Sequence, residues 1–515
     1  MLWTDKAKKY IKKYWGIDEL KPKQIEVMNA LLLGNDVIGL LPTGYGKSLC
    51  YILPPLIKKK TMIIVSPLIS LMEDQVTGLK NKKINCSALH CNNKNKDEET
   101  SQIIDGNIKI VYMSPEYLVK GNGKELIEIL INQNMLGFVA VDEAHCISNW
   151  SHDFRPDYKL IGNFRKLYPN ASIPIIAVTA TATDTVCDDI SKCIGLIKPT
   201  IIKASFDRPN LYIKVSELET LEKKIKNKKI KNIGIKADIV RKYMSKYEGH
   251  KIIVYINSKS DTEDLANELN TSEIITSAYH AGLTPKNRKL IHENFSSGKV
   301  NVIISTIAFG MGIDQIVKCV IIFGCSSSIE ENIQQCGRAG RDGLPGETLF
   351  FFEKGQFMLK KRLLQTEYKN KDLLMYKSEN IRKVWDYVYT TTCKRKHMLG
   401  YFNELTNYIT CNNCDNCCER KLVDMTIPFS NILFSEKNID NAYGKIINKY
   451  NCNGLTNLKN ILWLWKNYVQ TNKLDINKLD FQYKLRFNNN YITIQKEETK
   501  EDILNLQLEK YSKLF

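Results

Sequence analysis

The chain has 515 residues, too many for a single hydrophobic core, so we expect three or four domains. Lysine and arginine (74) outnumber aspartate and glutamate (56), and the net charge of +18 favours a polyanionic partner such as nucleic acid, unless it only reflects a lysine-rich composition. No apolar run suits a membrane span or a signal peptide, which argues against a membrane protein. We therefore expect a soluble intracellular protein, nuclear or cytoplasmic, with its 15 cysteines as thiols.

Short β-branched runs alternate with polar or helical stretches through the first two thirds of the chain. The first series comprises DVIGLL, TMIIVS, IKIVYMS, LGFVAV and IPIIAVT, and the second comprises KIIVYIN, SAYH, VNVIIST and CVIIFG and ends with TLFFFEK. Parallel strands joined by crossover helices have this pattern. We therefore predict an α/β fold with two parallel-sheet domains of one architecture, residues 1–205 and 206–352. A helical, cysteine-containing region (353–420) and a small α+β domain (421–515) with a hairpin near FNNNYITI are expected to follow.

The segment LLPTGYGKSLCY, Leu40 to Tyr51, follows a predicted strand and should open a helix. Gly44 and Gly46 allow the backbone to curl so that its N–H groups face phosphate oxygens. Lys47 would reach the β- and γ-phosphates, and Ser48 would ligate Mg²⁺. A glycine-rich turn without a ligand is the alternative, but it explains the Lys-Ser pair poorly.

Charged residues later in the chain complete a candidate ATP site. In VDEAH, Asp142 would hold Mg²⁺ and Glu143 would polarise the attacking water, unless the two are surface acids that cap a helix. In QQCGRAGRDG, Arg338 and Arg341 lie on one face if the segment is helical. Such arginines neutralise charge on a departing phosphate, or else form surface salt bridges. With the nucleotide between the two halves, hydrolysis would move them, as in a motor.

The motifs PTGYGKS, VDEAH, AVTATAT and QQCGRAGRDG resemble those of superfamily 2 helicases. Together with SPLISLMEDQV, DEAHCISNWSHDFRPDY and STIAFGMGID, they resemble the RecQ family of DNA helicases over roughly residues 15–417. The resemblance implies two RecA-like domains and ATP- and Mg²⁺-dependent translocation 3′ to 5′ along single-stranded DNA. It also implies that the protein unwinds tailed or branched duplex DNA.

The resemblance assigns roles residue by residue. Gln24 matches the adenine-reading glutamine, although Lys21 and Ile17 replace the arginine and the aromatic residue usual in the family. His145 matches a coupling residue that contacts Thr179–Thr183, Arg341 matches the arginine finger, and Gly310–Asp314 matches a segment linking ATP to DNA contacts. The remaining nucleotide contacts fall on the phosphate loop, at Thr43, Gly44, Tyr45, Gly46, Lys47 and Ser48.

The segment CISNWSHDFRP resembles the aromatic-rich loop of the family. Trp150 and Phe154 would offer flat faces to unstacked bases, and Arg155 would contact DNA or the nucleotide. Because the loop follows Glu143 closely, DNA binding could gate hydrolysis. The alternative is that both aromatic residues belong to the core.

Five cysteines lie between Cys393 and Cys418. Cys411, Cys414 and Cys417 have C-x₂-C-x₂-C spacing, which together with Cys393 suits a four-coordinate structural zinc site and matches the zinc-binding region of RecQ proteins. An iron–sulfur cluster is the rival, and Cys418 and His397 are competing ligands.

Residues 421–515 are long enough for a degenerate winged helix, with Trp463 and Trp465 expected in its core, or else as a wedge against DNA. Three functions fit the motifs: a DNA helicase, an RNA helicase or RNA-dependent ATPase, and an ATP-gated nucleic-acid clamp that does not hydrolyse ATP. Glu143 and Arg341 argue against the clamp, and the cysteine motif and aromatic loop favour DNA.

Overall fold

The structure is a computed structural model that describes residues 2–119, 122–148, 150–151, 154–169, 171–218, 233–271, 275–309, 315–408, 410–418, 423–424, 426–450, 458–471, 483–488 and 491–496. The chain forms two compact units: Met1–Thr390 with Arg395–Asn413, and Thr391–Lys394 with Cys414–Phe515. Among the described residues, no helix is both long and apolar enough to span a bilayer.

The first unit begins with a seven-stranded parallel sheet of order β3-β4-β2-β5-β6-β1-β7. Its strands are β1 (Val37–Leu40), β2 (Thr61–Val65), β3 (Cys86–Leu89), β4 (Ile110–Met113), β5 (Leu136–Val141), β6 (Ile175–Thr179) and β7 (Thr200–Lys203). Its helices are α1 (Trp3–Trp15), α2 (Pro22–Leu32), α3 (Leu49–Lys58), α4 (Ile69–Asn81), α5 (Lys96–Ile104), α6 (Pro115–Val119), α7 (Asn122–Asn132), α8 (Asn163–Leu167) and α9 (Asp184–Ile194), with short 3₁₀ turns η1 (Ala144–Ile147) and η2 (Pro156–Gly162).

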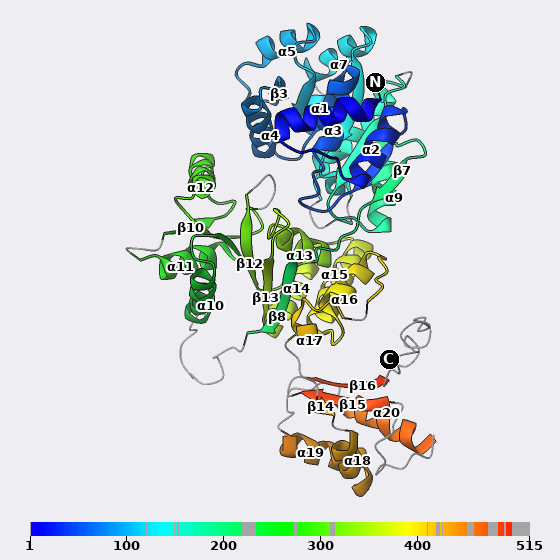
Figure 1. Ribbon diagram of the computed structural model, residues 1–515, viewed down its shortest axis with the longest axis vertical. Helices are drawn as coiled ribbons and strands as arrows, with labels where there is room; N and C mark the ends of the chain where they lie inside the picture. The colour runs from blue at the N-terminus through cyan, green and yellow to red at the C-terminus, as the bar shows by residue number, and fades with distance from the viewer. Residues whose placement is uncertain are drawn as a thin grey trace. The chain divides into compact units, whose positions relative to one another are not determined.

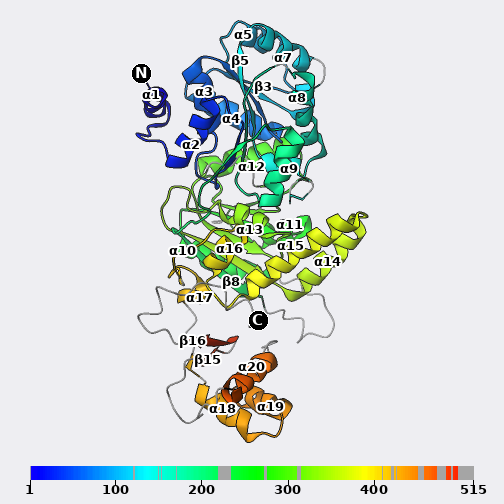
Figure 2. The same ribbon diagram turned by 90° about the vertical axis from the view of Figure 1, so that its right-hand side faces the viewer.

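Helices cover both faces of this sheet. Alternate strand residues such as Met62 and Ile64 pack with side chains of α1 to α4 in one buried cluster. Their neighbours, such as Ile63 and Val65, are equally buried on the opposite face. Figure 2 shows α3 and α4 on the opposite side of the sheet from α7 and α8. Burial on both faces explains why these strands are continuously apolar in the sequence.

The second sheet has six parallel strands in the order β10-β11-β9-β12-β13-β8. It contains β8 (Leu211–Glu217), β9 (Lys251–Ile256), β10 (Thr276–Tyr279), β11 (Val302–Ser305), β12 (Val317–Phe323) and β13 (Gly346–Phe352), with helices α10 (Ile233–Lys246), α11 (Lys259–Leu269), α12 (Pro285–Ser297) and α13 (Ile329–Cys336). Side chains of α10 and α11 pack on one face of this sheet. Two parallel-sheet domains are therefore confirmed (Figure 1).

Helices follow the second sheet, as predicted: α14 (Lys354–Glu367), α15 (Lys371–Tyr389), α16 (Lys394–Tyr401) and α17 (Asp415–Cys418). The next segment contains β14 (Val423–Asp424), α18 (Thr426–Ser435), α19 (Ile439–Tyr450), α20 (Leu458–Thr471), β15 (Tyr483–Asn488) and β16 (Tyr491–Lys496). The predicted hairpin is β15 paired with β16, and β14 completes an antiparallel sheet. Helices with a hairpin are compatible with a winged helix, which stays a prediction.

The two tryptophans of α20 have different environments. Trp465 is fully buried, and its indole N–H donates to Ser430 Oγ (2.8 Å), as expected for a core residue. Trp463 is 53% exposed, so its placement in the core was wrong. Residues two apart on a helix point to different sides, and only one of the pair can face the interior.

Candidate active site

Three sequence motifs meet at the carboxyl edge of the first sheet. The phosphate loop follows β1, the acidic pair Asp142 and Glu143 follows β5, and Thr179 ends β6, which lies between those two strands. Parallel strands end at the same edge, where α/β proteins bind their ligands. The strand order therefore brings together residues that lie up to 136 positions apart between Thr43 and Thr179.

The phosphate loop has a backbone that requires glycine. Gly44 (φ 81°) and Gly46 (φ 87°) adopt left-handed conformations, and a Cβ on Gly46 would lie 2.6 Å from Gln24 Nε2. The loop leads directly into α3, so the positive end of that helix faces the loop, as an anion site needs.

Gln24 is buried against the phosphate loop. Its Nε2 donates to the carbonyls of Tyr45 and Gly46 (3.0 Å each), and its Oε1 accepts from the Lys21 backbone N–H (2.8 Å). The Lys21 ammonium donates to the Gly44 carbonyl (3.2 Å) and lies 4.6 Å from the Tyr45 ring centroid. Gln24 thus supports the loop in this structure, and adenine reading by Gln24 stays a prediction.

Lys47 and Glu143 form an ion pair at the centre of the site. Lys47 Nζ lies 3.1 Å from Glu143 Oε1, and each side chain is 14% exposed. Burial opposes the charge of Glu143, but Lys47 and His145 outweigh it and lower the pKa of this carboxyl to about 2. Glu143 also has left-handed backbone angles (φ 45°, ψ 47°), a strained conformation that is uncommon for a residue other than glycine.

Ser48 and Asp142 are linked through a tyrosine that the motif analysis missed. The Tyr51 hydroxyl lies 3.1 Å from Ser48 Oγ and 3.2 Å from Asp142 Oδ2. Burial and the neighbouring Glu143 raise the pKa of Asp142, while Lys47 lowers it. A hydroxyl and a carboxylate held this close are oxygen donors of the kind that Mg²⁺ prefers, so the residues fit such an ion.

His145, which follows β5, contacts the end of the neighbouring strand β6. His145 is buried, and its Nδ1 lies 2.8 Å from Thr179 Oγ1, which confirms the predicted contact. The same nitrogen lies 3.4 Å from Glu143 Oε2. The Tyr158 hydroxyl, which sequence reasoning also missed, donates to the Asp142 backbone carbonyl (2.8 Å) and so fixes the backbone of the acidic pair.

The two arginines do not share a helix face. Helix α13 ends at Cys336, and both arginines follow in the glycine-containing turn. Arg338 is buried, and its charge helps to keep Glu143 ionised. A Cβ on Gly44 would lie 3.6 Å from Arg341 Cγ, so Arg341 packs beside the phosphate loop. The structure therefore brings both arginines to the site, by way of a turn.

The structure describes the aromatic-rich loop at residues 146–148, 150–151 and 154–156. Trp150 is half-buried, and its ring meets Tyr376 of α15 edge to face, with 5.0 Å between centroids. Lys159 lies over the Phe154 ring at 5.2 Å. The Arg155 backbone N–H donates to Cys146 (2.8 Å), and its Nη1 donates to the Pro67 carbonyl (3.1 Å). The end of the loop is thus tied to the turn that follows Glu143.

The cysteine cluster forms as predicted. The sulfur atoms of Cys393, Cys411, Cys414 and Cys417 all lie within 4.8 Å of one another. A tetrahedral zinc with Zn–S bonds of about 2.3 Å separates its sulfurs by about 3.8 Å, so these four residues fit the ion. Neither Cys418, which is exposed, nor His397 belongs to this cluster. The segment Gly310–Asp314, predicted to link ATP to DNA, lies outside the described residues.

Three family models match the chain in turn, over the first sheet domain, the second sheet domain and the helical region with the cysteines. Residues 21–190 match the DEAD/DEAH box helicase family, 235–343 match the helicase conserved C-terminal domain, and 352–418 match the RecQ zinc-binding family. The zinc model covers the cysteine cluster and supports zinc over an iron–sulfur cluster.

Curated relatives match most of the chain. A protein of Acanthamoeba polyphaga mimivirus, provisionally named an ATP-dependent RNA helicase, is 38% identical over 80% of this chain and 72% of its own length. The ATP-dependent DNA helicase RecQ of Haemophilus influenzae is 36% identical over 79% of this chain and 63% of its own. An ATP-dependent helicase of Saccharomyces cerevisiae is 36% identical, but the chain spans only 31% of it.

Solved structures share the fold at low identity. The helicase MrfA bound to DNA aligns with a TM-score of 0.56 and 18% identity over 75% of this chain and 57% of its own. The Mycobacterium smegmatis helicase Lhr, bound to single-stranded DNA and AMP-PNP, aligns with a TM-score of 0.53 and 18% identity over 71% of this chain and 49% of its own.

Proposed function

The chain belongs to the RecQ family of helicases, and on this premise we propose that Mg²⁺-dependent ATP hydrolysis drives it 3′ to 5′ along single-stranded DNA. It would unwind tailed or branched duplexes in replication, recombination or repair. The observation that carries this proposal is the joint placement of Lys47, Glu143 and Arg338 at the carboxyl edge of the first sheet. These are the parts that phosphoryl transfer to water requires.

The Lys47–Glu143 pair suggests how hydrolysis is restricted to the loaded site. In the structure, the Lys47 ammonium contacts the carboxylate that would accept the proton of the attacking water. When phosphates attract Lys47, Glu143 loses this partner and becomes available as a base. A bound Mg²⁺, held by Ser48 and Asp142, would supply the positive charge that offsets the phosphates. Arg338 and Arg341 would stabilise the charge that develops on the departing phosphate.

DNA is the proposed track because of the aromatic loop and the cysteine motif, while the net charge of +18 supports nucleic acid in general. Trp150 lies close in sequence to Glu143 and packs on α15, so a base that stacks on this indole would shift the loop that follows the catalytic carboxylate. RNA is the second candidate, and the name of the mimivirus relative favours it.

The test compares ATPase rates with single-stranded DNA and RNA of matched sequence, followed by unwinding of 3′- and 5′-tailed duplexes. We expect stronger stimulation by DNA and unwinding of the 3′-tailed substrate. Lys47→Ala serves as the control without hydrolysis. Stronger stimulation by RNA would replace the DNA proposal with its rival, and preference for the 5′-tailed duplex would overturn the direction.

A further inference from the structure

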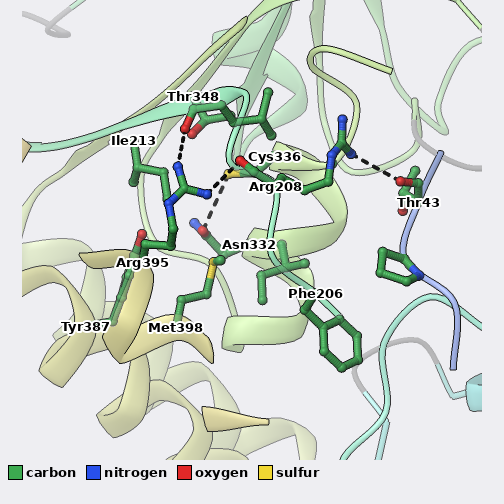
Figure 3. Close-up of a pocket in the computed structure, with 14 residues that line it drawn as sticks. Thr43, Phe206, Arg208, Ile213, Asn332, Cys336, Thr348, Tyr387, Arg395 and Met398 are labelled. Atoms are coloured by element: carbon green, nitrogen blue, oxygen red, sulfur yellow. Dashed lines mark hydrogen bonds between the residues drawn. The ribbon is translucent and has the colours of Figure 1, made fainter. Parts of the chain in front are cut away.

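One arginine outside the recognised motifs joins the two halves of the ATP site. Arg208 lies in the linker between β7 and β8, the strands on either side of the boundary between the two sheets. Its Nη1 donates to the carbonyl of Thr43 (3.1 Å), the residue before Gly44 in the phosphate loop (Figure 3). Its Nη2 donates to the carbonyls of Ala339 (3.1 Å) and Gly340 (2.7 Å).

The second pair of contacts lies within the arginine turn. Ala339 and Gly340 separate Arg338 from Arg341, so Arg208 holds the backbone between the two catalytic arginines. Gly340 (φ 56°) has no space for a side chain, because a Cβ there would lie 2.5 Å from Asn210 Nδ2. That nitrogen also donates to the Gly340 carbonyl (3.0 Å). One short linker thus fixes the turn and contacts the phosphate loop.

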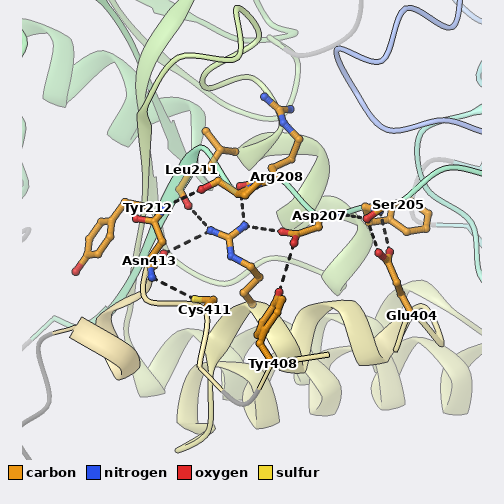
Figure 4. Close-up of polar contacts among 12 residues, drawn as sticks. Ser205, Asp207, Arg208, Leu211, Tyr212, Glu404, Tyr408, Cys411 and Asn413 are labelled. Atoms are coloured by element: carbon orange, nitrogen blue, oxygen red, sulfur yellow. Dashed lines mark hydrogen bonds and ion pairs between the residues drawn. The ribbon is translucent and has the colours of Figure 1, made fainter. Parts of the chain in front are cut away.

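The linker is itself fixed by a second arginine. Arg395 of α16 is only 2% exposed, and its Nη1 donates to Asp207 Oδ1 (2.9 Å) and to the Arg208 carbonyl (2.6 Å), as Figure 4 shows. Its Nη2 donates to the Leu211 carbonyl. Both carbonyls and the carboxylate belong to the linker or to the start of β8, so Arg395 holds the backbone on each side of the Arg208 side chain.

The same region connects to the cysteine loop through Asn413. The Asn413 side-chain amide donates to the Pro209 carbonyl (2.8 Å), and the Asn413 backbone carbonyl accepts from the Ile213 N–H (3.3 Å). Its own backbone N–H donates to the sulfur of Cys411 (3.4 Å), one of the four clustered cysteines. A continuous set of hydrogen bonds therefore runs from the cysteine loop through the linker to the phosphate loop.

We infer that Arg208 is a positioning residue for ATP hydrolysis: it sets the arginine turn against the phosphate loop, and Arg395 holds it in place. This inference rests on the proposed ATPase function of the same site. Arg208 bonds to backbone carbonyls, so it does not stabilise the phosphates itself and acts through Arg338 and Arg341. Its loss should lower the rate of hydrolysis without removing the residues that bind ATP.

A lysine is not expected to replace Arg208. The two terminal nitrogens of the guanidinium contact Thr43 on one side and Gly340 on the other, whereas a lysine offers a single nitrogen. A purely electrostatic role would tolerate the lysine. A role limited to stability would lower the melting temperature, ATP binding and turnover together.

The experiment measures kcat with saturating single-stranded DNA, the Kd of a fluorescent ATP analogue, and Tm in the full chain. Arg208→Ala and Arg208→Lys should each lower kcat by about tenfold or more, with the Kd changed by less than about threefold. Arg241→Ala is the matched control, because Arg241 pairs with Asp238 on the surface of α10 and should change none of these quantities. Arg208→Ala combined with Arg341→Ala should lose less than the product of the two single losses in kcat, because part of the Arg208 effect passes through Arg341.

Each outcome decides the matter. A wild-type kcat in folded Arg208→Ala, recovery of kcat in Arg208→Lys, or fully additive losses in the double variant would overturn the positioning role. A large fall in Tm with a parallel loss of ATP binding would show a structural role and overturn it too. If the unaltered protein hydrolyses no ATP, the proposed function fails, whereas normal hydrolysis with an unaffected Arg208→Ala variant rejects only this inference.

Discussion

Trp150→Ala separates a role in DNA coupling from a role in packing. The indole is half-buried, and its recorded ring contact is the edge-to-face pair with Tyr376 at 5.0 Å and 73°. We expect the variant to bind ATP normally, because no atom of the indole belongs to the phosphate site. DNA should stimulate its ATPase less, and unwinding should fall more than single-strand affinity, since other contacts still hold the DNA backbone.

The magnitudes distinguish the two roles. Loss of one aromatic pair removes about 0.5–1.5 kcal/mol of stability, which lowers Tm by about 1–6 °C for a domain of this size class. A fully buried tryptophan would instead cost about 3–5 kcal/mol. A base stacked on the indole contributes about 1–3 kcal/mol, equivalent to about 5- to 150-fold in an equilibrium constant. The free energy lost from base stacking should therefore exceed the free energy lost from folding stability.

The assay compares basal and DNA-stimulated ATPase rates with a melting curve for the same variant. Tyr376→Ala is the matched control, because it removes the same ring pair from the side of α15 and leaves the indole. We expect similar Tm losses in both variants and loss of DNA stimulation mainly in Trp150→Ala. Undiminished stimulation in Trp150→Ala would refute the coupling role, as would a Tm loss above ~6 °C with uniform loss of every activity.

Further predictions concern catalysis, the metal and the charge. Glu143→Gln should bind ATP but stop hydrolysis, because the amide accepts no proton; failure to bind the fluorescent ATP analogue would make Glu143 structural instead. Tyr51→Phe should raise the Mg²⁺ concentration that half-saturates the ATPase, because the hydroxyl that bridges Ser48 and Asp142 is lost, and an unchanged titration would contradict this. Metal analysis should find about one zinc per chain, with Cys414→Ala reducing the folded yield and Cys418→Ala mild; iron with visible absorption would contradict the assignment. Single-strand affinity should fall linearly with salt on a log–log plot, and a flat response would separate the basic charge from DNA binding.

The sequence alone was sufficient to predict the strands and loops that are defined by a short run of consecutive residues. The buried strands of both sheets are continuous apolar runs. The phosphate loop with Gly44 and Gly46, and the carboxylate pair after β5, can be recognised from residue types and spacing. Three strands escaped this reading. All three are edge strands: β3 (Cys86–Leu89) contains no β-branched residue, β7 has one buried residue, and β8 alternates buried and partly buried positions. None of them has the continuous apolar run on which the prediction depended.

The tertiary structure decided which distant residues became neighbours. Strand order placed Thr179 between the phosphate loop and the acidic pair, and it brought the Tyr51 hydroxyl to Asp142, 91 residues away. Arg208 and Arg395 carry no motif of their own, because their partners, apart from the Asp207 carboxylate that Arg395 contacts, are backbone carbonyls, which every residue possesses. A pattern of side chains can reveal a residue that meets a ligand. A residue that only fixes the backbone leaves no such pattern, and packing alone determines which carbonyls it reaches.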